Sequence, residues 1–183
     1  IASDGIDEGD VPWIVESVKA TKYDDAVAML DTFQPDIVSV GAVYGHNHRF
    51  IVECLKRDIP TVSDKPVAAT WEQLASLRNL LVGTRRILIT EFPFRSDPAF
   101  RAARDAVRKG KLGHVVLATA QKSYRFGHKR PKWYANRDDY TGTILWVASH
   151  AIDIIHFTTG LNYTQVFGRH GNLSRPDFGT MED

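Results

Sequence analysis

The 183-residue chain has a single cysteine, Cys54, so it cannot form an intrachain disulfide or a cysteine-based metal site. It also has almost no net charge, because 23 lysine and arginine residues stand against 22 aspartate and glutamate residues. Such a balance gives no field that would attract nucleic acid or an anionic membrane. No apolar run approaches the roughly 18 residues that span a bilayer, and the first residues lack the regions of a signal peptide. We therefore expect a cytoplasmic protein with no metal, nucleic-acid or membrane partner.

A glycine-rich phosphate loop is also absent, since none of the 13 glycines fits the spacing G-x-G-x-x-G. Residues 1–3 resemble the end of a strand, and Asp4 follows them. An acid there suits the residue that hydrogen-bonds the adenosine ribose about 20 positions after the glycines, although an ordinary turn fits equally well. We expect the phosphate loop to precede Ile1 and the chain to be cut at both ends. These residues alone should then bind nucleotide weakly.

The first half of the chain alternates short apolar runs with helical patterns. The runs predict strands at 36–42, 59–63 and 86–90, and the helical patterns cover 24–33, 48–57 and 70–82. This alternation indicates βαβ crossovers and a parallel sheet, the α/β fold class. Ligands bind beyond the carboxyl ends of such strands. The loops 41–48 and 63–68 are therefore the expected site.

After Glu91 the pattern changes, and we place a domain boundary there. Residues 1–91 are expected to form a partial Rossmann-type domain that lacks its first strand and helix. In residues 92–183, Asp97 and Pro98 begin a helix that Gly110 closes. The pattern further predicts a long antiparallel strand at 114–124, a helix at 145–157 and a strand from 164 to 168. This half is thus expected to be an incomplete α+β domain with an open antiparallel sheet.

Lys65 follows the predicted strand 59–63, where the sheet opens toward a ligand. A lysine near a low-dielectric crevice acts strongly on a substrate hydroxyl. Pro66 restricts the backbone of Lys65 to extended conformations. The alternative is an ordinary lysine in a surface turn.

The predicted helix 145–157 carries Trp146, His150, Asp153 and His156. His150 and Asp153 are i, i+3 neighbours, so Asp153 can fix the tautomer of His150 and make it a general base. A packing histidine beside a salt-bridging aspartate is the plainer alternative. One helix face cannot complete a tetrahedral metal site.

The stretch before this helix interleaves cations with aromatic residues. Its members are Tyr124, Arg125, Lys129, Arg130, Trp133, Tyr134 and Arg137. Aromatic faces and arginine forks recognise sugars and small acids. The same composition would suit single-stranded nucleic acid, but the near-zero net charge argues against it. A solvated loop is the remaining alternative.

Taken in order, these segments resemble the Gfo/Idh/MocA family of oxidoreductases. They are PDIVSVGAVYGHNH, DIPTVSDKP, FPFRSDPAFRAARDAVRKGKLGHVV, GTILWVASHAIDIIHFTTG and the terminal MED. The resemblance implies a Rossmann domain followed by an α+β domain with a mostly antiparallel sheet. It also implies NAD or NADP as cofactor, a sugar, polyol or related small-molecule substrate, and a homo-oligomer.

The resemblance assigns roles to individual residues. Lys65 matches the family's catalytic lysine and His150 its usual proton acceptor, so we expect both groups to meet one reacting oxygen. The residues expected to bind the cofactor are Asp4, Gly41, Ala42, Val43, Tyr44, Asp64 and Lys65. Those expected to bind the substrate are Lys65, Arg95, Tyr124, Trp133, Trp146 and His150.

Three positions depart from the family pattern. Asp64 replaces the usual glutamate, Asn47 stands where a histidine is common, and Trp146 occupies the place of an acid one helical turn before His150. An indole cannot accept a proton as that acid can. Three hypotheses follow: a hydride-transferring oxidoreductase, an NAD-dependent glycoside hydrolase on the same scaffold, and a non-catalytic ligand-binding relative.

Overall fold

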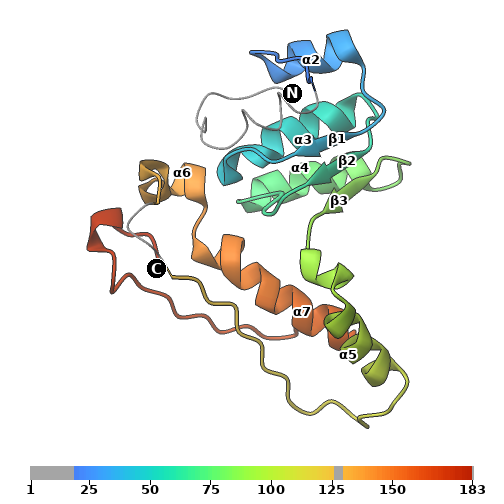
Figure 1. The fold of residues 1–183 in the computed structure, drawn as a ribbon, viewed down its shortest axis with the longest axis vertical. Helices are drawn as coiled ribbons and strands as arrows, with labels where there is room; N and C mark the ends of the chain where they lie inside the picture. The colour runs from blue at the N-terminus through green and yellow to red at the C-terminus, as the bar shows by residue number, and fades with distance from the viewer. Residues whose placement is uncertain (1–18, 126–129, 183) are drawn as a thin grey trace. The chain divides into compact units, whose positions relative to one another are not determined.

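A computed structural model describes residues 19–125 and 130–182 of the chain (Figure 1). The chain divides into two compact units, and the boundary lies between Glu91 and Phe92. None of the helices in the described residues is long and apolar enough to cross a membrane.

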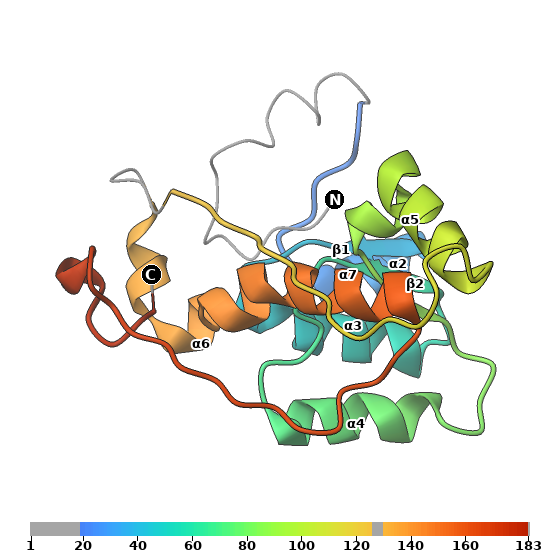
Figure 2. The ribbon, with the colours of Figure 1, turned by 90° about the horizontal axis from the view of Figure 1, so that it is seen from below.

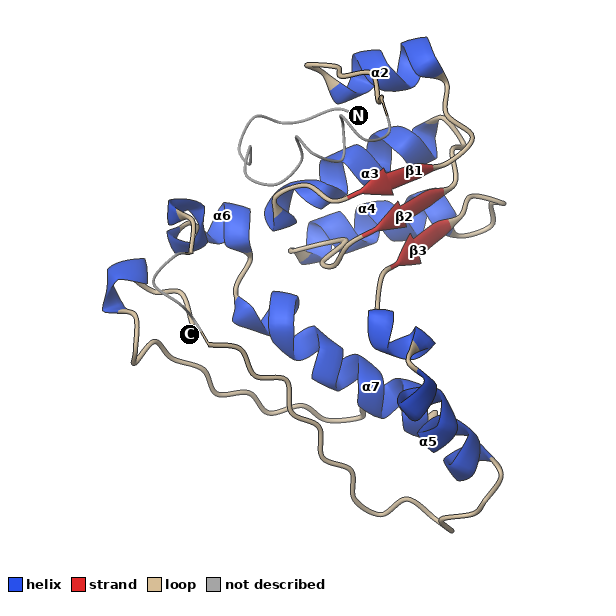
Figure 3. Ribbon diagram, viewed as in Figure 1, coloured by secondary structure: helices blue, strands red, loops and turns tan. Residues whose placement is uncertain are grey.

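The first unit is built on a parallel sheet of three strands. These are β1 (Val38–Val40), β2 (Thr61–Ser63) and β3 (Leu88–Thr90), in the order β1-β2-β3 (Figure 3). Val40 pairs with Ser63, and Ser63 pairs with Thr90. The carboxyl ends of all three strands therefore lie along one edge. The predicted strands and their parallel arrangement are confirmed.

Three helices accompany this sheet: α2 (Ala26–Phe33), α3 (Asn47–Lys56) and α4 (Trp71–Leu81). Two of them begin at side-chain caps. Asp25 accepts a hydrogen bond from the Ala28 N–H at 2.7 Å, and Thr70 accepts one from the Gln73 N–H at 3.2 Å. Such caps satisfy helix N–H groups that have no carbonyl partner within the helix. Local sequence thus determines where these helices begin.

The core of the first unit lies between the sheet and its helices. Val40, Ile51, Leu55 and Leu77 form the main buried cluster, with Val38 and Leu88 packed against it. A second cluster joins Leu30, Cys54 and Ile59. Fully burying an aliphatic side chain of this size contributes about 1.5–3 kcal/mol. The packing of α3 against the sheet fixes where the loop between β1 and α3 lies.

The second unit contains α5 (Pro98–Arg108), α6 (Arg137–Tyr140) and α7 (Ser149–Thr159). A stretch of π-helix, Ile144–Ala148, leads directly into α7. Short 3-10 turns occupy Pro93–Ser96, Lys132–Ala135 and Pro176–Phe178. Helices α5 and α7 pack against each other. Asp97 caps α5 by accepting the Ala99 N–H at 2.8 Å, and Pro98 is its first residue, as predicted.

The two strands expected in this unit, at 114–124 and 164–168, are not formed in the described residues. Both stretches are instead extended and run alongside α7 (Figures 1 and 2). Their apolar side chains face solvent: Val116 is 94% and Phe167 96% exposed. A strand requires a partner for its backbone N–H and C=O groups, and neither stretch pairs with a described segment. The antiparallel sheet therefore stays a prediction.

Candidate functional site

The loops that follow β1 and β2 lie next to each other at the carboxyl edge of the sheet. The Asp64 N–H donates to the Val40 carbonyl at 2.9 Å, which continues the strand pairing one residue beyond β2. The predicted loops 41–48 and 63–68 therefore start from adjacent points. Side chains that leave them can act on one ligand.

Lys65 is the charged group at the centre of this edge. It is only 8% exposed, and its Nζ lies 3.2 Å from Asp64 Oδ1. The same oxygen accepts the Lys65 backbone N–H at 2.8 Å. On another side, Nζ lies 5.9 Å from the centroid of the Tyr44 ring. The ammonium is thus held between a carboxylate and an aromatic face, where low local polarity strengthens its action on a nearby oxygen.

The loop between β1 and α3 brings several expected cofactor contacts together. Val43 is buried, and its carbonyl accepts the His46 N–H at 2.7 Å. Gly41 has open space around its Cα, with no atom within 4 Å of a hypothetical Cβ. A ligand can therefore approach the Gly41 backbone closely. Asp4, the expected ribose acid, lies outside the described residues.

Asn47, at the first position of α3, is fully buried and joins the two loops. Its Oδ1 accepts the Ala42 N–H at 3.0 Å. Its Nδ2 donates to the carbonyls of Asp64 and Pro66, at 3.2 and 3.3 Å. The sequence marked Asn47 only as a departure from a common histidine. Its contacts depend on a segment 17–19 residues away, which no local pattern reveals.

In the second unit, α7 carries His150. The side chain is buried, 6% exposed, with the rings of Phe92 and Phe94 packed edge-on at centroid distances of 5.9 and 5.3 Å. Two aromatic rings therefore pack against the imidazole. Phe92 and Phe94 begin this unit, so the residues just after the boundary shape the surroundings of His150.

The structure gives Asp153 the salt-bridging role of the plainer alternative, with Arg95 as its partner. Its carboxylate accepts hydrogen bonds from Arg95, with Nε at 2.9 Å from Oδ2 and 3.2 Å from Oδ1. This hydrogen bond raises the pKa of Arg95 above its ordinary value. Asp153 therefore anchors α7 to the turn Pro93–Ser96 instead of orienting His150. Arg95, expected at the substrate, is engaged by this carboxylate.

Trp146 belongs to an aromatic cluster, which we define as Tyr124, Trp133, Tyr134, Tyr140 and Trp146. Tyr124 stacks on Trp146 at a centroid distance of 5.7 Å. The Arg130 guanidinium lies 5.1 Å from the Tyr134 ring and 5.4 Å from the Trp146 ring. Three expected substrate contacts, Tyr124, Trp133 and Trp146, thus share one cluster.

Tyr140 was not among the candidate residues, yet it lies fully buried in this cluster. Burial raises the pKa of its hydroxyl to about 12. The hydroxyl is 2.8 Å from Thr143 Oγ1. Tyr140 at neutral pH is therefore a neutral group that ties the cluster to the start of the π-helical stretch.

Glu182 anchors the beginning of that stretch. Its Oε2 lies 2.7 Å from Arg137 Nη2, and its Oε1 accepts the Ile144 N–H at 3.3 Å. Its own carbonyl accepts the Thr143 hydroxyl at 2.7 Å. Burial opposes ionisation, but hydrogen bonds from Arg137 and backbone N–H groups outweigh it and lower the pKa of Glu182. A buried carboxylate therefore holds the helical segment that carries Trp146 and His150.

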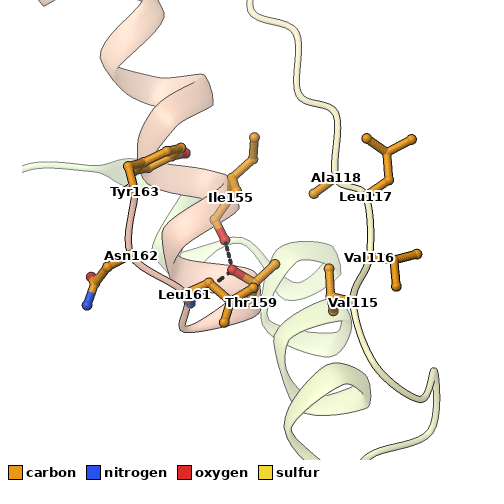
Figure 4. Close-up of a pocket in the computed structure, with 9 residues that line it drawn as sticks. All are labelled: Val115, Val116, Leu117, Ala118, Ile155, Thr159, Leu161, Asn162 and Tyr163. Carbon is orange, nitrogen blue, oxygen red and sulfur yellow. Dashed lines mark hydrogen bonds between the residues drawn. The ribbon is translucent and has the colours of Figure 1, made fainter. Parts of the chain in front are cut away.

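A separate apolar cleft of about 250 Å³ lies in the second unit (Figure 4). It is formed by residues 115–118 and the end of α7, where the Thr159 hydroxyl donates to the Ile155 carbonyl at 2.7 Å. None of the residues expected to bind cofactor or substrate lines it. In the part of the chain that the structure describes, no group of three potential metal ligands forms a site either.

The parallel sheet and the polar loops at its carboxyl edge define a Rossmann-type α/β protein. Residues 7–92 match the family model described as "Oxidoreductase family, NAD-binding Rossmann fold". Residues 100–183 match that described as "GFO/IDH/MocA C-terminal domain". The chain belongs to the Gfo/Idh/MocA oxidoreductase family, which confirms the resemblance seen in its segments.

Curated relatives include D-glucoside 3-dehydrogenase of Escherichia coli K12, 25% identical over 154 residues, which are 82% of this chain and 43% of the relative. Another is inositol 2-dehydrogenase 2 of Saccharopolyspora erythraea, 23% identical over 89% of this chain and 47% of the relative. The chain thus spans about half the length of the curated relatives it matches.

Solved structures share the fold. A Thermotoga maritima protein superimposes with a TM-score of 0.91 at 32% identity, covering 100% of this chain and 57% of that protein. The myo-inositol 2-dehydrogenase of Lactobacillus plantarum gives 0.84 at 20% identity, covering 100% and 56%. An inositol dehydrogenase homologue of Azotobacter vinelandii, solved with NAD⁺, gives 0.68 at 18% identity, covering 75% and 39%.

Proposed function

We propose that the protein to which these residues belong is an NAD(P)-dependent oxidoreductase acting on a hydroxyl-bearing carbon of a sugar, polyol or related compound. The observation that carries the proposal is the buried ammonium of Lys65 at the carboxyl edge of the parallel sheet. Membership of an NAD-binding oxidoreductase family supports it, as do the dehydrogenases among its relatives. The nicotinamide cofactor, when bound, supplies the hydride acceptor or donor.

The open backbone at Gly41 fits a cofactor at this edge of the sheet, since a ligand can approach there without meeting a side chain. Ala42, Val43 and Tyr44 would line the same loop. The cofactor is NAD or NADP, and NAD⁺ in the solved Azotobacter vinelandii homologue favours testing NAD first.

Lys65 would donate a hydrogen bond from Nζ to the substrate oxygen. That contact stabilises the negative charge that develops as the hydroxyl proton leaves. Asp64 Oδ1 would hold the ammonium in position from the other side. His150 is the proposed proton acceptor, because a neutral imidazole has a free electron pair for this task.

The aromatic cluster would bind the apolar face of a sugar or polyol. Stacked rings such as Tyr124 and Trp146 offer flat apolar area, and Arg130 adds polar donors beside them. We further propose that the full-length protein is a homo-oligomer located in the reducing cytoplasm. The single cysteine, which is buried, fits that setting.

The test uses the full-length protein with NAD(H) or NADP(H) and a panel of polyols and oxo-sugars, following nicotinamide absorbance. Lys65→Ala should lower kcat by about 10²–10³-fold, the usual cost of removing one hydrogen-bond donor that stabilises developing negative charge. Lys56→Ala is the matched control, because Lys56 is an exposed lysine paired with Glu53 on α3. Absence of turnover with every substrate, or full activity of Lys65→Ala, would contradict the proposal.

The position of Trp146 favours a second candidate, an NAD-dependent glycoside hydrolase on the same scaffold. Trp146 replaces a proton-accepting acid and lies inside the aromatic cluster. Release of an aglycone from a glycoside, with no net accumulation of NADH, would support this candidate over simple oxidation. Binding of nucleotide without turnover of any polyol, oxo-sugar or glycoside would instead indicate a non-catalytic relative.

A further inference from the structure

The fully buried amide of Asn47 bridges the two loops at the sheet edge. Three hydrogen bonds join the amide to backbone groups: Oδ1 accepts from one N–H, and Nδ2 donates to two carbonyls. The orientation of the amide is therefore determined, since a flipped amide would point its N–H groups at a donor and its oxygen at two acceptors.

The two carbonyls that Asn47 binds belong to Asp64 and Pro66, the residues on either side of Lys65. The backbone that carries Lys65 is thus held at both ends by one side chain. The third bond reaches Ala42, in the loop expected to lie beside the cofactor. A single amide therefore links the loop after β1 to both flanks of the lysine.

We propose that Asn47 is a positioning residue that sets the location of the Lys65 ammonium relative to the loop after β1. This inference rests on the proposed function. The Asn47 amide contacts the backbone at Ala42, Asp64 and Pro66, so one side chain links all three positions. Buried polar networks of this kind fix one geometry because each broken bond leaves a group unpaired.

Alternative side chains of similar size cannot make the same contacts. An aspartate at position 47 would keep the acceptor for Ala42 but would point an oxygen at the two carbonyls. A leucine would leave the Ala42 N–H and the Pro66 carbonyl unpaired. The Asp64 carbonyl would keep one bond in either case, because the Ser63 hydroxyl also donates to it at 2.9 Å.

The test compares Asn47→Asp with Asn79→Asp, the same chemical change at an exposed asparagine of α4. In the full-length protein, Asn47→Asp should lower kcat by about 100-fold, the effect of misplacing a reacting group by about 1 Å. KM for the substrate should change far less. Leu55→Ala, which weakens the buried core on the α3 side of the sheet, serves as a control for loss of stability alone.

A second readout does not require activity. Amide hydrogen exchange in peptides covering 41–46 and 64–67 should accelerate on the order of tenfold in Asn47→Asp, reflecting lost hydrogen bonds in a local opening. Peptides from α4 should exchange as in the wild type. If Asn47→Asp does not fold, Asn47→Ser, which removes the amide without adding charge, replaces it.

The outcomes separate the two proposals. If the wild-type protein shows no activity but hydrogen exchange in both loops still accelerates in Asn47→Asp, the proposed function is contradicted. The role of Asn47 in linking the two loops is then supported. Unchanged exchange, or a kcat loss no greater than that of Leu55→Ala, would overturn the positioning role of Asn47.

Discussion

Gly142 lies where an unusual backbone conformation meets a buried ion pair. Its φ is +97°, and a Cβ there would collide with the Glu182 carboxylate and lie 2.7 Å from Arg137 Nη1. We expect Gly142→Ala to lower the free energy of unfolding by about 1–3 kcal/mol through backbone strain, and by more through the displaced pair. Urea denaturation measures the loss.

Gly160 provides the matched control for that change. Its φ is also positive, +73°, but nothing lies within 4 Å of a Cβ there. Gly160→Ala should therefore show only the conformational penalty. Equal losses at the two positions would indicate that the contact with Glu182 has no energetic consequence.

Arg95 and Asp153 form an unequal pair, because the aspartate is buried while the arginine is half-exposed. Removing Arg95 leaves a buried carboxylate with its main donor gone. Arg95→Leu should therefore lower the free energy of unfolding by about 1–3 kcal/mol, and Arg95→Leu with Asp153→Leu should recover part of the loss. Chemical denaturation of the single and double variants measures this coupling.

An exposed salt bridge with a similar N–O distance provides the comparison. Arg86 Nε lies 2.7 Å from Asp58 Oδ1, but Asp58 is exposed. Surface pairs contribute about 0–1 kcal/mol, so Asp58→Asn should be nearly neutral. A double variant at 95 and 153 that is no more stable than Arg95→Leu would show that the uncompensated charge is not the cause.

For single residues, the sequence predicted where a side chain lies in the fold better than which other side chain it bonds to. The position of Lys65 just after a strand could be predicted because a motif and a strand end coincide within a few residues, whereas its catalytic role stays a prediction. A salt-bridging role for Asp153 was foreseen as an alternative, but its partner was not, because Arg95 lies 58 residues away in the chain. Side-chain partners across such separations are determined by packing that no local pattern encodes.

Among the elements, the helical segment from Ile144 to Thr159 depends on Glu182 for its first free N–H group. Hydrogen bonds lower the pKa of this carboxyl below its ordinary value of 4.5. A lowered pKa stabilises the fold at neutral pH, and that stabilisation disappears as the pH falls through the folded-state pKa. Glu182→Gln should therefore destabilise the protein at pH 7 and flatten its stability profile below about pH 5.

Thermal unfolding of both proteins across that acid range checks the expectation. Glu53→Gln is the control, since the lowered pKa of Glu53 comes from hydrogen bonds with Lys56 and Arg57 near the surface of α3. A profile for Glu182→Gln that parallels the wild type at every pH would contradict the role assigned to this carboxylate.

Element boundaries were predictable where their signals are local. Thr70 and Asp97 cap their helices within three residues, and the short apolar runs became strands of the parallel sheet. The stretches 114–124 and 164–168 show the limit of the same reasoning. Alternation of apolar and polar side chains indicates that the two faces of a stretch differ in polarity. A strand also needs a hydrogen-bonding partner, and the alternation does not reveal which segment that is.

Over the whole molecule, the 183 residues contain the loops at the carboxyl edge of a Rossmann-type sheet but no glycine-rich phosphate loop. Backbone N–H groups of such a loop provide much of the binding to a dinucleotide pyrophosphate. We therefore expect this polypeptide to bind NAD only weakly, with a dissociation constant above the micromolar range. Isothermal titration checks this, and micromolar affinity would contradict it.

The extended segments beside α7 have a practical consequence. Leu117 and Val166 are largely exposed there, as are Val116 and Phe167. Apolar side chains next to backbone groups that pair with no described segment form a template on which another polypeptide can add a strand. We therefore expect this polypeptide to self-associate as its concentration rises.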